Sequence, residues 1–148
     1  EQKVETEMPK ILGELDGDRI VDAPLAVSAH CNRVPVRNGH LECISVELGR
    51  KASTGDIIKA LGEFRGSAAV RALPSSPSRP IIVQMEGDRP QPLRDSDTGG
   101  GMSVVVGRVR PCPVFDTRFV VLGHNTVRGA AGGSLHNAEL LAAQGWLA

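Results

Sequence analysis

The feature that most constrains the fold is a group of short apolar runs that follow one another along the chain. Residues 81–85 (IIVQM), 102–110 (MSVVVGRVR) and 118–122 (RFVVL) are rich in β-branched residues, as strands are. Residues 40–48 (HLECISVEL) add the two-residue alternation of a strand. Because these runs cluster instead of alternating strictly with helices, the sequence predicts an α+β fold. We expect a mixed, largely antiparallel sheet with helices packed on one face.

An extended segment and a tight turn are expected before the strand at residues 40–48. Residues 13–18 read as a turn, and residues 25–36 (LAVSAHCNRVPV) predict extended structure. Asn38-Gly39 follows, a pair typical of two-residue hairpin turns. The sequence therefore predicts a hairpin that joins residues 25–36 to residues 40–48.

Three segments predict helices. Residues 1–12 carry apolar side chains at helical spacing, and Pro9 is expected to interrupt or kink this helix. Ser53 and Asp56 have the spacing of a capping box and precede an apolar helical face. Residues 126–144, rich in Ala and Gly, predict the last helix.

Composition excludes several classes of function. The 148 residues suit one domain, and 17 basic residues balance 17 acidic ones, so the basic excess of a nucleic-acid-binding protein is missing. Three Phe and one Trp are too few for a base-stacking platform. No apolar run approaches the roughly 20 residues that span a bilayer. Three cysteines without a CxxC pair favour a reducing compartment, so we expect a cytoplasmic protein without nucleic-acid or membrane partners.

Residues 33–40 (RVPVRNGH) carry the pattern that is most informative about chemistry. If the predicted turn closes a hairpin, two-residue alternation puts Arg33 and His40 on one face. Their offset of about 13 Å could be covered by an extended guanidinium and a small carboxylate. The pattern fits an anion clamp opposite a titratable base. A surface arginine and histidine that flank a turn explain the same spacing, and both interpretations stay open at this point.

Three motifs carry a resemblance to a known family. The run CNRVPVRNGH at residues 31–40 resembles the hallmark segment of aspartate-semialdehyde dehydrogenases. Residues 89–110 (RPQPLRDSDTGGGMSVVVGRVR) and 120–141 (VVLGHNTVRGAAGGSLHNAELL) resemble the branch of that family found in archaea and fungi. The segment that ends in E-x-x-K-I-L at residues 7–12 is also similar, so the resemblance covers nearly the whole chain.

The resemblance implies that residues 1–148 form a C-terminal catalytic and dimerisation domain, with the fold of the C-terminal domain of glyceraldehyde-3-phosphate dehydrogenase. The chain has no start methionine and no GxGxxG motif. We therefore expect an N-terminal dinucleotide-binding domain elsewhere in a longer protein, and no turnover by this chain alone. In the family the last helix packs towards that domain, so part of its surface is expected to be bare here.

The implied reaction is the reversible, phosphate-dependent oxidation of L-aspartate 4-semialdehyde to L-aspartyl 4-phosphate with NADP, used in lysine, threonine and methionine biosynthesis. A cysteine thiolate attacks the aldehyde, and such catalysis needs a base beside the thiol. NADP is bound mainly by the N-terminal domain. The implied partners are the substrate, phosphate and a second copy of the chain, in a homodimer or larger homo-oligomer that uses the sheet face opposite the helices.

Carried over by motif, the resemblance assigns five site residues. His40 is the acid/base catalyst, and Arg33 binds the substrate carboxylate. Glu7 contacts the substrate amino group, and Lys10 belongs to the phosphate site. Asn125 approaches the nicotinamide and is the expected cofactor contact.

Other candidate sites in the sequence have weaker support. Cys31 and Cys43 lie on predicted strands and are expected to be inert core residues, because the family's catalytic cysteine belongs to the N-terminal half. The glycine run at residues 98–101 precedes a strand rather than a helix, so it is not a phosphate-binding loop. Three further histidines match no metal-ligand spacing and are expected to be structural: His30, His124 and His136.

Three alternative functions stay open. An acyl-CoA reductase of the same fold is similar to this branch, and Lys10 is the position that separates the two. N-acetyl-glutamyl-phosphate reductase is a more distant relative that the RVPVRNGH run fits less well. In a non-catalytic dimerisation module, Arg33 and His40 would only hold a hairpin.

Overall fold

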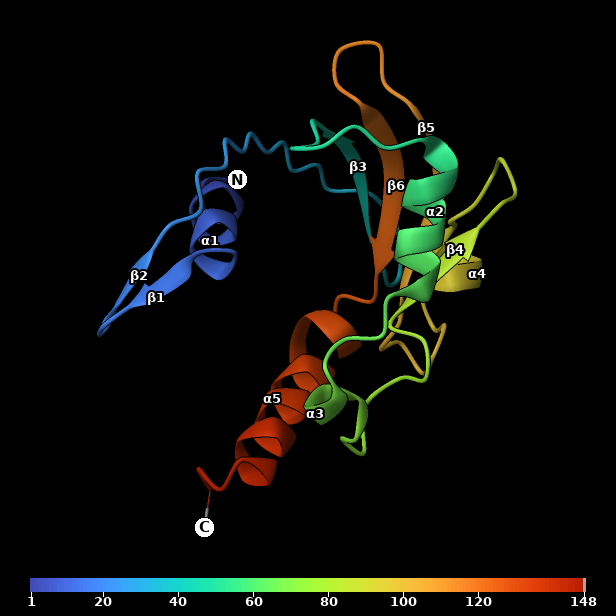
Figure 1. Cartoon of the computed structure of the whole chain (residues 1–148). Helices are drawn as coiled ribbons and strands as arrows, with labels where there is room; N and C mark the ends of the chain where they lie inside the picture. The colour runs from blue at the N-terminus through green and yellow to red at the C-terminus, as the bar shows by residue number, and fades with distance from the viewer. Residues whose placement is uncertain (148) are drawn as a thin grey trace. The chain divides into compact units, whose positions relative to one another are not determined.

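A computed structural model describes residues 1–147, and the chain divides into two compact units, Glu1–Pro35 and Val36–Ala148 (Figure 1). The division falls at the end of the segment predicted to be extended. No helix within residues 1–147 is long and apolar enough to cross a membrane.

The first unit begins with helix α1 (Gln2–Ile11), which confirms the helix predicted there. The helix continues through Pro9, so of the predicted interruption or kink the interruption is wrong. Proline lacks an N–H and removes one helical hydrogen bond, but its carbonyl accepts a hydrogen bond from the Ala23 N–H at 3.0 Å. This bond ties the chain after the helix back to α1.

A short hairpin of strands β1 (Glu14–Asp16) and β2 (Arg19–Val21) follows α1. Its two-residue turn has Gly17 in the left-handed region, with a φ of +60°, as such turns require. The sequence predicted only a turn here, because three residues per strand are too few to show an alternating pattern.

Residues 25–36 form no strand, so the extended strand predicted there is wrong. Their backbone is held by carboxylates of the first unit instead of by a partner strand. Glu5 Oε1 accepts from the Ala29 N–H, and Glu1 Oε1 accepts from the Cys31 N–H, both at 2.9 Å. The bond from Cys31 lowers the pKa of the Glu1 carboxyl.

The second unit is built on one four-stranded sheet in the order β3-β6-β5-β4. The strands are β3 (His40–Val46), β4 (Ile81–Gln84), β5 (Val104–Pro111) and β6 (Thr117–Gly123). β6 is antiparallel to both neighbours, whereas β4 and β5 are parallel. The predicted α+β class with a mixed, largely antiparallel sheet is confirmed.

Helix α2 (Thr54–Glu63) packs on β4 and β5, where Gly62 approaches Val83 (Figure 1). The predicted capping box is present. The Asp56 N–H donates to Ser53 Oγ, and the Ser53 N–H donates to the Asp56 carboxylate, both at 3.1 Å. The bonds from Ser53 lower the pKa of Asp56.

The last helix is confirmed, and its first turns are unusual. A π-helix, η1 (Val127–Ala131), leads into helix α5 (Gly132–Ala143). The one-turn helix α3 (Ala68–Arg71), which the sequence did not predict, contacts α5.

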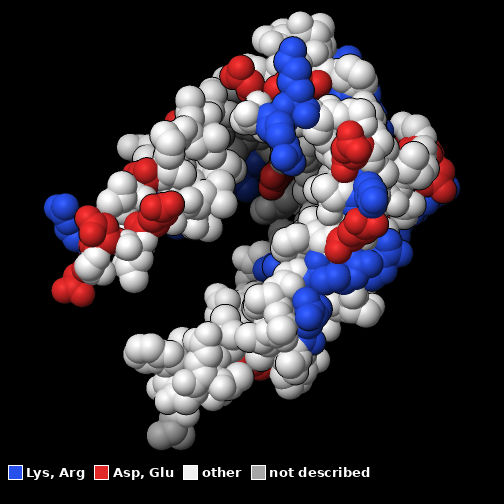
Figure 2. All heavy atoms as spheres, viewed as in Figure 1, with Lys and Arg blue, Asp and Glu red and all other residues white. Residues whose placement is uncertain are grey.

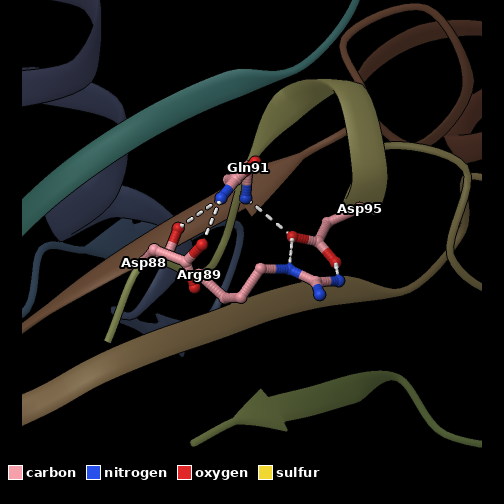
Figure 3. Close-up of polar contacts among 4 residues, drawn as sticks. All are labelled: Asp88, Arg89, Gln91 and Asp95. Carbon is pink, nitrogen blue, oxygen red and sulfur yellow. Dashed lines mark hydrogen bonds and ion pairs between the residues drawn. The ribbon is translucent and has the colours of Figure 1, made fainter. Parts of the chain in front are cut away.

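Residues 86–101, with the one-turn helix α4 (Pro92–Asp95), cross the sheet face opposite α2. A Cβ at Gly107 would lie 2.4 Å from the Arg89 carbonyl oxygen, so only glycine permits this contact. Arg89 forms a two-bond ion pair with the buried Asp95 carboxylate, whose pKa it lowers (Figure 3). The buried side chains beneath include Val105, Val120 and Leu122, whereas the buried Val106 lies on the face towards α2.

Candidate active site

Two predicted site residues meet where β3 begins and β6 ends. His40 is the first residue of β3 and pairs with Gly123, the last residue of β6. The Gly39 N–H donates to Asn125 Oδ1 at 2.9 Å. Gly39 is buried, whereas His40 is exposed and open to a reactant. We call Gly39, His40, Gly123, His124 and Asn125 the β3/β6 corner.

Gly39 has no room for a side chain. Its φ is +99°, and a Cβ would lie 2.8 Å from Leu122 Cδ1 and 3.4 Å from Pro92 Cβ. Only glycine therefore lets the chain enter β3 in this way. The predicted hairpin at Asn38-Gly39 is wrong, because β3 pairs with β6 and not with the preceding segment.

Arg33 lies in the first unit, on a segment without strand pairing, and its side chain is exposed. His40 lies in the second unit. The hairpin that would place the two side chains on one face does not form, so the spacing argument for an anion clamp no longer holds. The assignment of Arg33 now rests on the resemblance alone.

A buried histidine fixes the turn that carries Asn125. His124 is 5% exposed, and its Nδ1 lies 3.3 Å from the Thr126 N–H nitrogen and 3.2 Å from that of Val127. Because both N–H groups donate, Nδ1 accepts and the ring proton sits on Nε2, which lies 3.4 Å from Asp97 Oδ1. Sequence reasoning predicted a structural histidine but missed this capping role. The available signal was the position of this histidine, two residues before the helix predicted at residues 126–144, where a ring nitrogen can accept from the first N–H groups of the helix.

Glu7 and Lys10 lie one helical turn apart on α1 and line one cavity of about 440 Å³ in the first unit. Ile11 of α1 and Leu15 and Ile20 of the hairpin line the same cavity. Glu7 also forms an ion pair with Lys3 at 3.5 Å, but both side chains are exposed, so this pair contributes little. A carboxylate and an ammonium beside an apolar wall can hold a small molecule that carries both charges.

The cysteines differ from expectation. Cys31 and Cys43 are exposed, so the prediction that they are core residues is wrong, although Cys43 does lie on a strand. Cys112 is half-buried, and the Phe115 and Val114 N–H groups lower the pKa of its thiol. Within residues 1–147, no three His, Cys, Asp or Glu side chains gather as metal ligands.

His136 lies beside a serine hydroxyl, at 2.7 Å between its Nε2 and Ser76 Oγ. The Ser76 hydroxyl donates its own hydrogen to the Val70 carbonyl. His136 must therefore donate to Ser76, so it cannot act as the base that activates this hydroxyl. The pair is a structural link between the segment after α3 and α5.

Known proteins resemble this chain over nearly its full length. The aspartate-semialdehyde dehydrogenase of Methanothermobacter thermautotrophicus is 47% identical over 143 residues, which are 95% of this chain and 41% of the relative. The enzyme of the same name from Archaeoglobus fulgidus is 50% identical over 141 residues, 95% of this chain and 40% of the relative. The chain thus spans about two fifths of the length of these relatives.

Solved structures agree with the fold. The crystal structure of aspartate semialdehyde dehydrogenase with NADP from Candida albicans matches with a TM-score of 0.89 and 41% identity, covering 99% of this chain and 43% of that one. Aspartate semialdehyde dehydrogenase II of Vibrio cholerae complexed with ASA matches with a TM-score of 0.59 and 28% identity. The match covers 74% of this chain and 29% of that one. The profile of the semialdehyde dehydrogenase dimerisation domain matches residues 1–128. The resemblance found in the sequence is thus confirmed, and the chain belongs to the semialdehyde dehydrogenase dimerisation-domain family.

Proposed function

We propose that this chain is the substrate-binding and dimerisation part of an NADP-dependent aspartate-semialdehyde dehydrogenase. The whole enzyme converts L-aspartate 4-semialdehyde, phosphate and NADP into L-aspartyl 4-phosphate and NADPH. The observation that carries the proposal is the match of 99% of this chain to a solved enzyme of that name with NADP. We further place the enzyme in the cytoplasm, without nucleic-acid or membrane partners, in line with its balanced charge and free cysteines.

Each site residue has a chemical task in this proposal. His40 takes the proton of the attacking thiol and later returns a proton, because an imidazole changes charge near neutral pH. The planar Arg33 guanidinium binds the substrate carboxylate through two hydrogen bonds. Glu7 binds the substrate ammonium, and Lys10 binds phosphate. Their common cavity, which has charged and apolar walls, supports these two assignments.

The attacking thiol is supplied by the dinucleotide-binding part of the whole protein. NADP, when bound, supplies the hydride acceptor. Asn125 fits as its contact in this chain, because the amide nitrogen has no hydrogen-bond partner within residues 1–147 and can donate.

The test is an assay of the whole protein that contains this chain, following NADPH formation from L-aspartate 4-semialdehyde with and without phosphate. Activity should require phosphate, and His40→Ala should lower kcat by about 10²- to 10⁴-fold. His30→Ala is the matched control, because His30 is an exposed histidine of the first unit without a site role. Turnover of acyl-CoA substrates only, or full activity in His40→Ala, would exclude the proposal.

We also propose that the enzyme is a homodimer or a larger homo-oligomer. The dimerisation-domain family supports self-association of this part of the chain. Residues 86–101 cover β5 and β6 on the face opposite α2, whereas Leu41 and Cys43 of β3 stay exposed on that face. We therefore expect the contact to include β3. Sedimentation equilibrium of the whole protein should give at least twice the monomer mass, and Leu41→Lys should reduce it.

A further inference from the structure

We infer that Asn125 is a positioning residue for His40: its side-chain oxygen holds the Gly39 N–H and so fixes the backbone from which the His40 imidazole projects. The inference rests on the proposed function, in which His40 is the acid/base catalyst. It gives Asn125 a task inside the protein in addition to its expected contact with the cofactor.

The orientation of the Asn125 amide follows from the chemistry of its partner. A backbone N–H can only donate, so the side-chain atom 2.9 Å from the Gly39 nitrogen must be the oxygen. The amide nitrogen is then directed elsewhere and has no partner within residues 1–147. Asn125 therefore has one end engaged by the chain and two N–H hydrogens left to donate.

The Gly39 N–H depends on this acceptor. The ladder between β3 and β6 begins at His40, so Gly39 has no partner in the sheet. Gly39 is also buried, and a buried N–H without an acceptor is costly. Glycine at a φ of +99° is conformationally permissive, so the bond adds an orientation for this peptide that packing against Leu122 and Pro92 does not set by itself.

Asn125 is itself held firmly enough to serve as an anchor. The ring of His124, which precedes Asn125, accepts hydrogen bonds from the N–H groups of Thr126 and Val127, which follow it. The far ring nitrogen of His124 faces Asp97 at 3.4 Å. The anchor therefore joins the end of β6 and the start of η1 to the residue directly before His40.

The test uses the whole enzyme, three variants and a fourth variant held in reserve. Asn125→Ala removes the acceptor and the donor, whereas Asn125→Asp keeps an oxygen acceptor and removes the N–H donors. Asn137→Ala is the matched control, because Asn137 is exposed on α5 and its side chain has no hydrogen bond within residues 1–147. Asn125→Ser, with a side chain one bond shorter, replaces Asn125→Ala if the latter does not fold.

Two readouts do not depend on turnover. Hydrogen exchange at the Gly39 amide, resolved by mass spectrometry, reports the bond. The rate at which diethyl pyrocarbonate modifies His40, followed across pH, reports changes in the surroundings of the imidazole. We expect Asn125→Ala to speed Gly39 exchange at least about tenfold and to shift the pH profile of His40 modification, with Gly39 protection restored in Asn125→Asp. In the active enzyme, kcat should fall at saturating NADP in Asn125→Ala.

Three results would overturn the inference: unchanged Gly39 exchange in Asn125→Ala, faster exchange with an unchanged His40 profile, or lost Gly39 protection in Asn125→Asp. Inactivity of the unsubstituted enzyme towards L-aspartate 4-semialdehyde would count against the proposed function alone. The exchange and modification measurements would still decide the role of Asn125 in that case.

Discussion

Arg108 has a backbone conformation that its side chain disfavours. Within residues 1–147 it is the one non-glycine residue with a positive φ, +57°, and it lies where the pairing of β5 with β6 shifts register. We predict that Arg108→Gly raises the free energy of unfolding by about 0.5–1 kcal/mol, because glycine accepts this conformation and the arginine side chain is exposed. Urea denaturation measures the change.

The control is the next residue of the same strand. Val109 has no positive φ, so Val109→Gly should lower the free energy of unfolding by about 1 kcal/mol. If Arg108→Gly destabilised the protein as much as Val109→Gly, backbone strain at Arg108 would be excluded.

Asp95 is the buried charge on which the segment over the sheet depends. It is 1% exposed, and it accepts from the Arg89 guanidinium and from the Gln91 N–H at 2.6 Å. Asp95→Asn leaves Arg89 without its counter-charge, so the free energy of unfolding should fall by about 2–3 kcal/mol at pH 7. Asp88→Asn is the control, because an amide oxygen can still accept from Gln91, and it should change stability by less than about 0.5 kcal/mol.

The Asp95 carboxylate also predicts that the free energy of unfolding falls at acid pH. Arg89 lowers the pKa of Asp95 below the value near 3.9 of an unfolded chain. The stabilisation is therefore fully present above that value and is lost as pH falls through the lower, folded pKa. Urea midpoints measured from pH 7 down to pH 3 should fall less steeply in Asp95→Asn than in the unsubstituted protein. Parallel slopes would argue against this role of Asp95.

At the scale of an element, α2 depends on its first turn. The capping box satisfies the Ser53 and Asp56 N–H groups at the exposed helix start. Ser53→Ala removes the acceptor, and we expect it to lower the free energy of unfolding by about 1 kcal/mol. Ser53→Thr keeps a hydroxyl and should stay within a few tenths of a kcal/mol of the original. Equal losses in both variants would mean that the hydroxyl is not what stabilises the helix.

The elements that the sequence predicted share a local signal. The β-branched runs or the helical spacing lie within a few residues in four elements that the sequence predicted correctly: β4, β5, β6 and α2. The failures have tertiary causes. Asn38-Gly39 has the local pattern of a hairpin, but the positive φ of Gly39 serves to enter β3, whose partner β6 lies far along the chain. Long-range pairing overrides a turn preference of two residues.

In the candidate site, too, the sequence indicated the local features and missed the long-range contacts. The residue types and motif spacing around His40 were enough to indicate the family. The contact of Gly39 with Asn125 spans 86 positions, and no periodicity in the sequence encodes it. The capping role of His124 was equally hidden, because it depends on where the π-helix η1 begins.

At the scale of the whole molecule, charge and apolar surface are unevenly distributed. Basic and acidic side chains intermingle over much of the visible face, whereas the end that carries α5 is nearly uncharged (Figure 2). Four large apolar side chains are exposed there, and we call them the C-terminal apolar residues: Leu135, Leu141, Trp146 and Leu147. Several exposed apolar side chains at one end of the chain favour association in water.

We predict that the 148-residue chain on its own associates through the C-terminal apolar residues as its concentration rises. The double variant Leu135→Gln/Leu141→Gln removes apolar surface from α5 without burying a polar group, because both leucines are more than two fifths exposed. In sedimentation velocity, the rise of the mean sedimentation coefficient with concentration should be reduced. Leu93→Gln, at a leucine 95% exposed on α4, is the matched control and should behave like the unsubstituted chain. If both variants associate alike, apolar exposure in general, and not the C-terminal apolar residues, drives the association.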